Sequence, residues 1–179
     1  MNNIPDEDVS YKLNRFVLPV AIHPSKTADT RSADKLVTKA ELLESSEQHI
    51  AEVNRVMQMF RNALSSQAQY HDWTKLQYID LFYSDFAKAQ KENADFTKLK
   101  WFKLHVTKER HHLFEHVPED VNLFDILERI ADITTAGIGR SGWFDIEKEL
   151  AFDPELLKRA YINTIKWTLN KIKLVKEEE

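Results

Sequence analysis

The chain has 179 residues, enough for one domain with a substantial hydrophobic core. It carries 25 basic and 29 acidic residues, for a formal net charge of −4, and no basic block, which argues against binding to duplex nucleic acid. There is no Cys, which excludes disulfides, iron–sulfur clusters and thiol catalysis. With 3 Gly and 5 Pro, the chain lacks the turn residues of a sandwich or barrel, so we expect an all-α fold.

We expect an irregular N-terminal arm over residues 1–36 and a single helical domain over residues 37–179. The arm contains a short apolar stretch, Phe16 to Ile22, which is expected to pack on the domain as a strand-like piece. The first ten residues have neither the basic nor the apolar region of a signal peptide. No apolar run approaches the ~20 residues of a membrane helix. We therefore expect a cytoplasmic protein without a membrane partner, in the host cytoplasm if the gene is viral.

Apolar residues at helical spacing predict a bundle of about five main helices. The first begins at Thr38, which with Glu41 forms a capping box, and runs to about Leu64. Its apolar residues, including Leu43, Ile50 and Met57, form a predicted buried stripe, and His49 lies on or beside it. The other helices are expected at residues 71–91, 97–108, 123–136 and 154–175. A loop at residues 137–142, which contains all three glycines, is expected after the fourth helix.

Six of the seven histidines lie between residues 49 and 116. Neutral imidazole and carboxylate groups together are the usual ligands of Zn, Fe, Mn or Ni. Asp132, among apolar neighbours on a predicted helix, is costly to bury unless it is paired or bound to a metal. Histidines and carboxylates on successive helices can converge between the packed helices. The predicted metal ligands are His49, His71, Asp72 and Asp132, with His105, His111 and His112 as further candidates.

Each candidate also has a purely structural interpretation. His49 can be a hydrogen-bonded core histidine, and Asp72 can be a helix cap beside an ordinary His71. Asp132 can form a buried ion pair with Arg129 or Arg140. His105, His111 and His112 can be a polar surface cluster. Two further histidines, His23 and His116, are left outside the predicted site.

The order of His49, then His71-Asp72, then Asp132 resembles the H…HD…D signature of the HD superfamily of metal-dependent phosphohydrolases. Proteins of that superfamily are helical, and the four signature residues bind one divalent metal. The three intervening histidines are similar to those of two-metal members, in which the Asp of the HD pair bridges to the second ion. The resemblance implies one or two ions of Fe, Mn, Zn, Ni or Mg, with Asp72 as the bridging residue.

Within the superfamily, the chain is most similar to an uncharacterised family of bacterial and phage proteins. The matching segments are an HDxSK-like motif with Lys75, an H-x5-HH motif and a late E-x3-D motif formed by Glu128 and Asp132. The GYP segment of the cyclic-dinucleotide phosphodiesterases is missing. The resemblance covers about residues 42–142.

The resemblance implies a phosphohydrolase that acts on a small phosphorylated molecule, with a nucleotide as the first choice. Its catalytic residues would be Asp72, Lys75 and Arg140, the last two stabilising charge on the phosphoryl group. A di-iron oxygenase with the same ligand order is the alternative from another enzyme class. A third alternative is a non-catalytic binding protein, possibly encoded by a phage, that kept the HD fold. The sequence leaves open whether the chain forms a homo-oligomer.

Overall fold

The computed structural model describes residues 17–23 and 36–175 and is mostly helical, which confirms the predicted fold class. Most of the predicted N-terminal arm, residues 1–16 and 24–35, lies outside the described residues. Five helices have nine residues or more, namely α2 (Lys39–Tyr70), α4 (Ile79–Glu92), α5 (Lys100–Lys108), α6 (Leu123–Ser141) and α7 (Pro154–Lys171). In the part of the chain that the structure describes, none of the helices combines the length and hydropathy of a membrane span.

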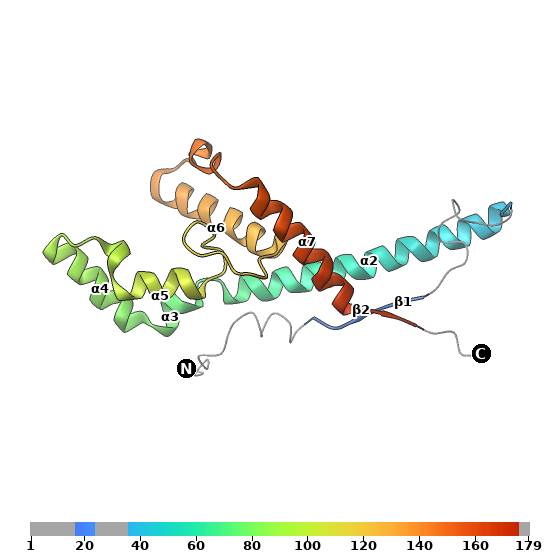
Figure 1. Ribbon diagram of the computed structural model, residues 1–179, viewed down its shortest axis with the longest axis horizontal. Coiled ribbons are helices and arrows are strands. Elements are labelled where there is room, and N and C mark those ends of the chain that lie inside the picture. Colours follow the sequence, from blue (N-terminus) through green and yellow to red (C-terminus); the bar gives the residue numbers. More distant parts are fainter. Residues whose placement is uncertain (1–16, 24–35, 176–179) are drawn as a thin grey trace.

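Helix α2 runs along the length of the molecule, and the other helices lie toward its C-terminal end (Figure 1). It begins at the predicted capping box, in which Thr38 and Glu41 exchange hydrogen bonds. Its 32 residues extend over about 48 Å at 1.5 Å per residue, beyond the predicted end at Leu64. The predicted buried stripe is wrong in the first half of the helix, where Leu43 and Ile50 are 57% and 59% exposed. This half extends beyond the other helices (Figure 1), although His23 forms hydrogen bonds with Gln48 and Glu52 there.

The segment after α2 consists of two helices where the sequence predicts one. Helix α3 (Trp73–Gln77) ends at Tyr78, and α4 begins immediately afterwards. Asn93, with a positive φ of 52°, ends α4. A short 3-10 helix, η2 (Phe96–Lys98), leads into α5. The buried carboxylate of Asp85 accepts a hydrogen bond of 2.8 Å from the backbone N of Trp101, which fixes the start of α5 against α4.

Helices α6 and α7 form an antiparallel pair, and α6 packs against α2. Asn122 and Asp125 form a capping box at the start of α6. The predicted glycine loop is wrong, because α6 continues through residues 137–141 and ends at Gly142 with φ 76°. Gly137 packs against the ring of Phe144, where a Cβ atom would lie only 2.9 Å from Cδ2. A 3-10 helix, η3 (Ile146–Glu149), connects this end to α7, whose N-terminal cap is Asp153.

Two short strands form a parallel pair beside α2 (Figure 1). Strand β1 (Val20–Ile22) lies in the apolar stretch of the arm, and β2 (Ile172–Leu174) follows α7 directly. The sequence predicted a strand-like piece at β1 but extended the last helix through β2, to about Val175. That helix ends at Lys171, because the backbone of Ile172 to Leu174 pairs with β1.

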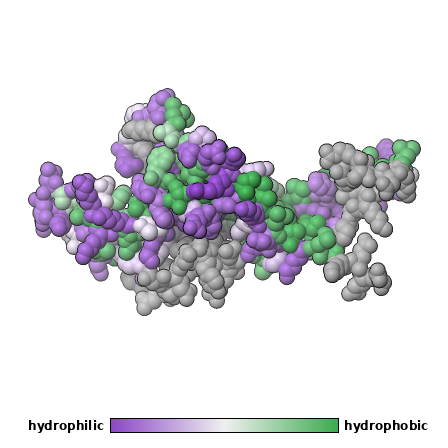
Figure 2. Space-filling view, in the orientation of Figure 1, coloured by the Kyte–Doolittle hydropathy of each residue, from purple (hydrophilic) through white to green (hydrophobic). Residues whose placement is uncertain are grey.

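Two clusters of buried apolar residues hold these elements together. One lies between α6, α7 and the loop before α6, and it contains Leu113, Val121, Ile126, Leu156 and Ala160. The other joins α2 to α6 and contains Val17, Met59, Ala63 and Phe124. Where α7 crosses α2, Phe124 packs edge to face on both Phe60 and Trp167, and the rings of Phe60 and Trp167 are tilted by 37°. Figure 2 shows hydrophobic residues gathered over this crossing, whereas the end formed by α4 and α5 is mainly hydrophilic.

Candidate metal centre

The helical conformation is broken between α2 and α3, at His71 and Asp72. His71 is the C-terminal cap of α2, and Asp72 has the left-handed conformation, with φ 57° and ψ 24°. This conformation is uncommon for any residue other than glycine, although Asp and Asn adopt it more readily than most residues. Strained backbone of this kind is concentrated at functional sites. The break places two adjacent side chains, one imidazole and one carboxylate, at the junction of three helices.

Side chains from four parts of the chain converge on this break. His71 and Asp72 lie between α2 and α3, His105 lies on α5, and a pair of histidines follows in the loop after α5. Two carboxylates come from one face of α6, where a spacing of four residues places them one turn apart. The resulting cluster, which we call the His–Asp cluster, contains His71, Asp72, His105, His111, His112, Glu128 and Asp132.

One half of the cluster surrounds Oδ1 of Asp72. The Nε2 atoms of His105 and His111 lie 3.5 Å and 3.8 Å from this oxygen. The Nε2 atom of His112 lies 2.8 Å from that of His105. His105 and His111 are almost fully buried, at 4% and 1% exposure. One carboxylate oxygen and three imidazole nitrogens therefore face a common point.

The other half of the cluster surrounds His71. Its Nε2 atom lies 3.3 Å from Oδ2 of Asp72 and 3.5 Å from Oδ1 of Asp132. The imidazole of His111 lies against that of His71, with ring centroids 4.6 Å apart, and its Nε2 atom is 4.0 Å from Oδ2 of Asp132. Asp72 thus presents one oxygen to each half of the cluster.

The carboxylate of Glu128 contacts the Nδ1 atoms of two of these histidines. Its Oε1 atom lies 2.9 Å from Nδ1 of His71 and 3.2 Å from Nδ1 of His111. The ionised carboxylate accepts the Nδ1–H of His71, so that Nε2 of this ring faces the cluster, whereas its contact with Nδ1 of His111 is an ion pair without a hydrogen bond. The other oxygen of Glu128 accepts a hydrogen bond from Gln67 on α2. Glu128 is therefore placed as the positioning carboxylate of His71 and His111.

His105 is oriented by a second buried chain of hydrogen bonds. Its Nδ1 atom lies 2.6 Å from Oγ1 of Thr74, and Thr74 donates both this hydroxyl and its backbone N–H to Glu109. Because the hydroxyl proton goes to Glu109, Thr74 accepts the Nδ1–H of His105, which leaves Nε2 of His105 with the lone pair. The imidazole also stacks on Trp101, with ring centroids 4.6 Å apart.

The charges of the cluster are set by these contacts. Hydrogen bonds to Asp132, Asp72 and Glu128 raise the pKa of His71 to about 11, so this imidazole is protonated at pH 7 and a bound metal would have to replace its Nε2 proton. Burial acts to raise the pKa of Asp72, but His71 and Lys75 outweigh it and hold that pKa well below its ordinary value. Burial lowers the pKa of His105 to about 3 and that of His112 to about 4. At pH 7 the last two are therefore neutral, the form in which imidazole binds a metal.

The residues of the cluster fit a divalent metal ion. Three buried atoms of the cluster, Oδ1 of Asp72 and both ring nitrogens of His111, have no hydrogen-bond partner among the residues that the structure describes. Buried polar atoms without partners are rare and costly, so their convergence indicates a site that a cation completes. The mixture of imidazole and carboxylate suits Zn, Fe, Mn or Ni better than Mg, which prefers oxygen ligands. The cluster could therefore hold a metal ion.

The structure brings together every predicted ligand except His49. His49 is exposed in the middle of α2, about 33 Å from the end of the helix at His71, given a rise of 1.5 Å per residue. The prediction that it is a ligand is therefore wrong, since one continuous helix keeps the two histidines apart. The alternative pairing of Asp132 with an arginine is also wrong, because Arg129 pairs with Glu149, at 2.8 Å.

Glu128 was missing from the predicted ligands, although its spacing from Asp132 gave a usable signal. We expect Glu128→Gln to lower the affinity for Zn²⁺ by about 10- to 100-fold, the usual effect of losing a carboxylate behind a metal-binding histidine. Glu115→Gln, on the half-exposed carboxylate 3.8 Å from Nδ1 of His112, is the matched control and should change the affinity little. Competition with a chromogenic chelator measures both. Equal affinities for Glu128→Gln and the wild type would remove Glu128 from its positioning role.

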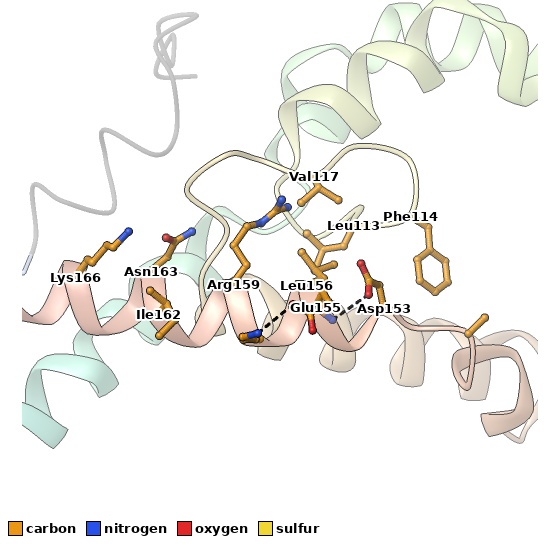
Figure 3. A pocket seen from close by; sticks show the side chains of 12 residues that line it. Leu113, Phe114, Val117, Asp153, Glu155, Leu156, Arg159, Ile162, Asn163 and Lys166 are labelled. Atoms are coloured by element: carbon orange, nitrogen blue, oxygen red, sulfur yellow. Dashed lines mark hydrogen bonds and ion pairs between the residues drawn. The ribbon is translucent and has the colours of Figure 1, made fainter.

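Two cavities of the described domain reach the cluster. A cavity of about 550 Å³ lies beside His105 and His112 and is also lined by Lys75 and Arg140, the two predicted catalytic cations. An apolar cavity of about 330 Å³ lies on the other side, between α2 and α6, and is lined in part by His71, Glu128 and Asp132. A cavity of about 900 Å³ lies between α7 and the loop that contains Leu113 and Val117 (Figure 3). None of the cluster residues lines this last cavity, so it is not part of the candidate site.

The comparisons with known proteins agree with the extent of this domain and are silent about its chemistry. No curated protein and no solved structure matches the chain. Residues 38–171 match the family described as "Family of unknown function (DUF5662)". The match begins at the N-terminal cap of α2 and ends at the last residue of α7, so it includes every residue of the His–Asp cluster. The chain therefore belongs to the DUF5662 family.

Proposed function

We propose that this chain is a metal-dependent phosphohydrolase that acts on a small phosphate ester. The observation that carries the proposal is the position of Asp72, which presents one oxygen to His71 and the other to His105 and His111, with Lys75 beside it. The resemblance to the HD superfamily supports it, because the order from His71 to Asp132 is that of the two-metal members. The absence of His49 from the cluster leaves one residue of that signature without a counterpart.

The proposed division of labour follows from the contacts. A divalent metal, when bound, supplies a water that is nucleophilic at neutral pH and a Lewis acid for a phosphoryl oxygen. His71, Asp72, His105, His111, His112 and Asp132 would hold it, and Glu128 would fix the orientation of two of these histidines. The ammonium of Lys75 has three donors, and its ion pair with Asp72 leaves two for a phosphoryl oxygen.

Arg140 is a second candidate cation for the substrate. It lies in the last turn of α6 and lines the same cavity as Lys75, His105 and His112. Its Nε donates a hydrogen bond to the backbone oxygen of Ala136, 3.0 Å away. The two terminal nitrogens have no partner among the described residues, so both are available to an anion.

The first test is hydrolysis of 4-nitrophenyl phosphate and bis(4-nitrophenyl) phosphate by protein loaded in turn with Mn²⁺, Zn²⁺, Fe²⁺, Ni²⁺ and Mg²⁺. We expect hydrolysis that chelation abolishes. Lys75→Ala should lower kcat/KM by about tenfold to a thousandfold, with metal content unchanged, because Lys75 stabilises charge without binding the metal. Lys88→Ala, on the exposed surface of α4, is the control. Failure of every metal to support hydrolysis of either ester would overturn the proposal.

A di-iron oxygenase is the second candidate, and the apolar cavity beside His71 and Asp132 favours it. That cavity is lined mainly by apolar side chains, including Leu64, Phe124 and Leu127, and it suits a substrate that is oxidised at a C–H bond. Elemental analysis of protein purified without chelator separates the candidates. Two equivalents of iron, visible absorbance and no phosphatase activity would favour the oxygenase, whereas colourless, active protein would favour the hydrolase.

A further inference from the structure

The cavity beside His105 has a polar end and an aromatic end. Lys75, Arg140, His105 and His112 line the polar end, next to the His–Asp cluster. The remainder is lined mainly by rings of the α4–α5 hairpin and η2: Phe82, Phe86, Phe96, Trp101 and Phe102. Concave sites with an apolar wall and a few convergent polar groups are typical of small-molecule binding.

The rings form a continuous wall that starts at a candidate metal ligand. His105 stacks on Trp101 at 4.6 Å between centroids, and Trp101 stacks in turn on Phe82 at 3.8 Å. Phe96 lies 5.7 Å from Trp101 and 6.3 Å from Phe86, with the last pair edge to face. Phe86 is 46% exposed, so part of its ring is accessible to a ligand. A flat ring in this cavity would therefore have aromatic faces and edges to contact.

We propose that this cavity is the substrate site and that it selects phosphate esters of a planar ring system, such as a nucleoside. The inference rests on the proposed phosphohydrolase function and adds the class of the organic group. The phosphate would lie at the polar end, between Lys75 and Arg140 and beside His105 and His112. The ring would lie against Phe86 and Phe96, at the end of the cavity that is remote from the cluster.

The test compares equilibrium binding of adenosine 5′-monophosphate, ribose 5-phosphate and inorganic phosphate by calorimetry, on metal-stripped and on Zn²⁺-loaded protein. We expect the nucleotide to bind about tenfold or more tightly than ribose 5-phosphate, the usual gain from stacking one base on an aromatic side chain. Phe86→Leu keeps an apolar side chain but removes the ring, and should abolish most of this difference while ribose 5-phosphate binding is unchanged. Phe114→Leu, on the half-exposed ring of the separate cavity in Figure 3, is the control.

The outcomes separate this inference from the proposed function. Equal affinities for the nucleotide and ribose 5-phosphate, or a nucleotide preference that Phe86→Leu leaves intact, would overturn the aromatic subsite. Neither result would bear on the proposed function, which is tested by the hydrolysis of 4-nitrophenyl phosphate. Conversely, preferential nucleotide binding by a protein that hydrolyses no phosphate ester would overturn the proposed function and leave the binding site in place. Lys75→Ala should weaken the binding of all three ligands by a similar factor, since each carries a phosphate.

Discussion

Asp72→Asn is expected to lower the affinity for Zn²⁺ by more than about 100-fold and phosphatase activity by more than about 1,000-fold. Asp72 contributes an oxygen to both halves of the His–Asp cluster, so its loss affects every ion that the cluster can hold. Asn is the most conservative replacement, because it tolerates the left-handed backbone at φ 57° about as well as Asp. A loss of function would therefore report the missing charge and not backbone strain.

Asp80→Asn, on the exposed first turn of α4, is the matched control and should retain wild-type metal content. Thermal unfolding provides a second readout, since a ligand that binds only the native state raises Tm. Zn²⁺ should raise the Tm of the wild type and of Asp80→Asn, and should leave that of Asp72→Asn nearly unchanged. A folded Asp72→Asn protein with undiminished metal content would show that the cluster is not the metal site.

Arg110→Ala is expected to lower the free energy of unfolding by about 3–5 kcal/mol, the usual cost of leaving one partner of a buried ion pair alone. The guanidinium of Arg110 makes two hydrogen bonds of 2.8 Å to the two oxygens of Asp125, whose side chain is fully buried. It also bonds Asp120, at 2.9 Å. Arg110 thereby ties the loop that carries His111 and His112 to the start of α6.

A second variant identifies the cause of that loss. Adding Asp125→Asn to Arg110→Ala removes the uncompensated charge, so the double variant should be no less stable than Arg110→Ala, although Asp125→Asn alone is destabilising. Arg159→Ala, on the exposed face of α7, should change stability by less than about 0.5 kcal/mol. Chemical denaturation measures all four proteins. A loss below about 1 kcal/mol for Arg110→Ala would mean that Asp125 is adequately solvated without its partner.

The histidines show how far local pattern predicts a site. Adjacent polar residues at a helix break, such as His71 and Asp72, and acidic residues one turn apart, such as Glu128 and Asp132, converge because short-range geometry fixes their directions. His49 was misassigned because the length of α2 depends on what happens at residues 64–71, where no glycine or proline ends the helix. Extending the helix by two turns moved its middle far from the site.

The same limit applies to the ends of other elements. The glycines at 137 and 139 indicated a loop, but tertiary packing against Phe144 accommodates Gly137 within α6. Ile172 continued the apolar periodicity of α7, yet its backbone forms a strand because β1 provides a partner. Apolar periodicity identifies which residues are candidates for burial, whereas the partner that buries them is set by contacts that are distant in sequence.

The parallel pairing of β1 with β2 has a consequence for how the protein folds during its synthesis on the ribosome. Val20 pairs with Ile172, so the two strands are separated by about 150 positions along the chain. Domains begin to fold during synthesis, but β1 leaves the ribosome long before β2 exists. Strand β1 therefore stays unpaired while the helices form. Its pairing with β2 is among the last folding events. Contacts of such long range slow folding, so a nascent chain halted before residue 172 should carry an assembled helical body with a loose amino-terminal strand.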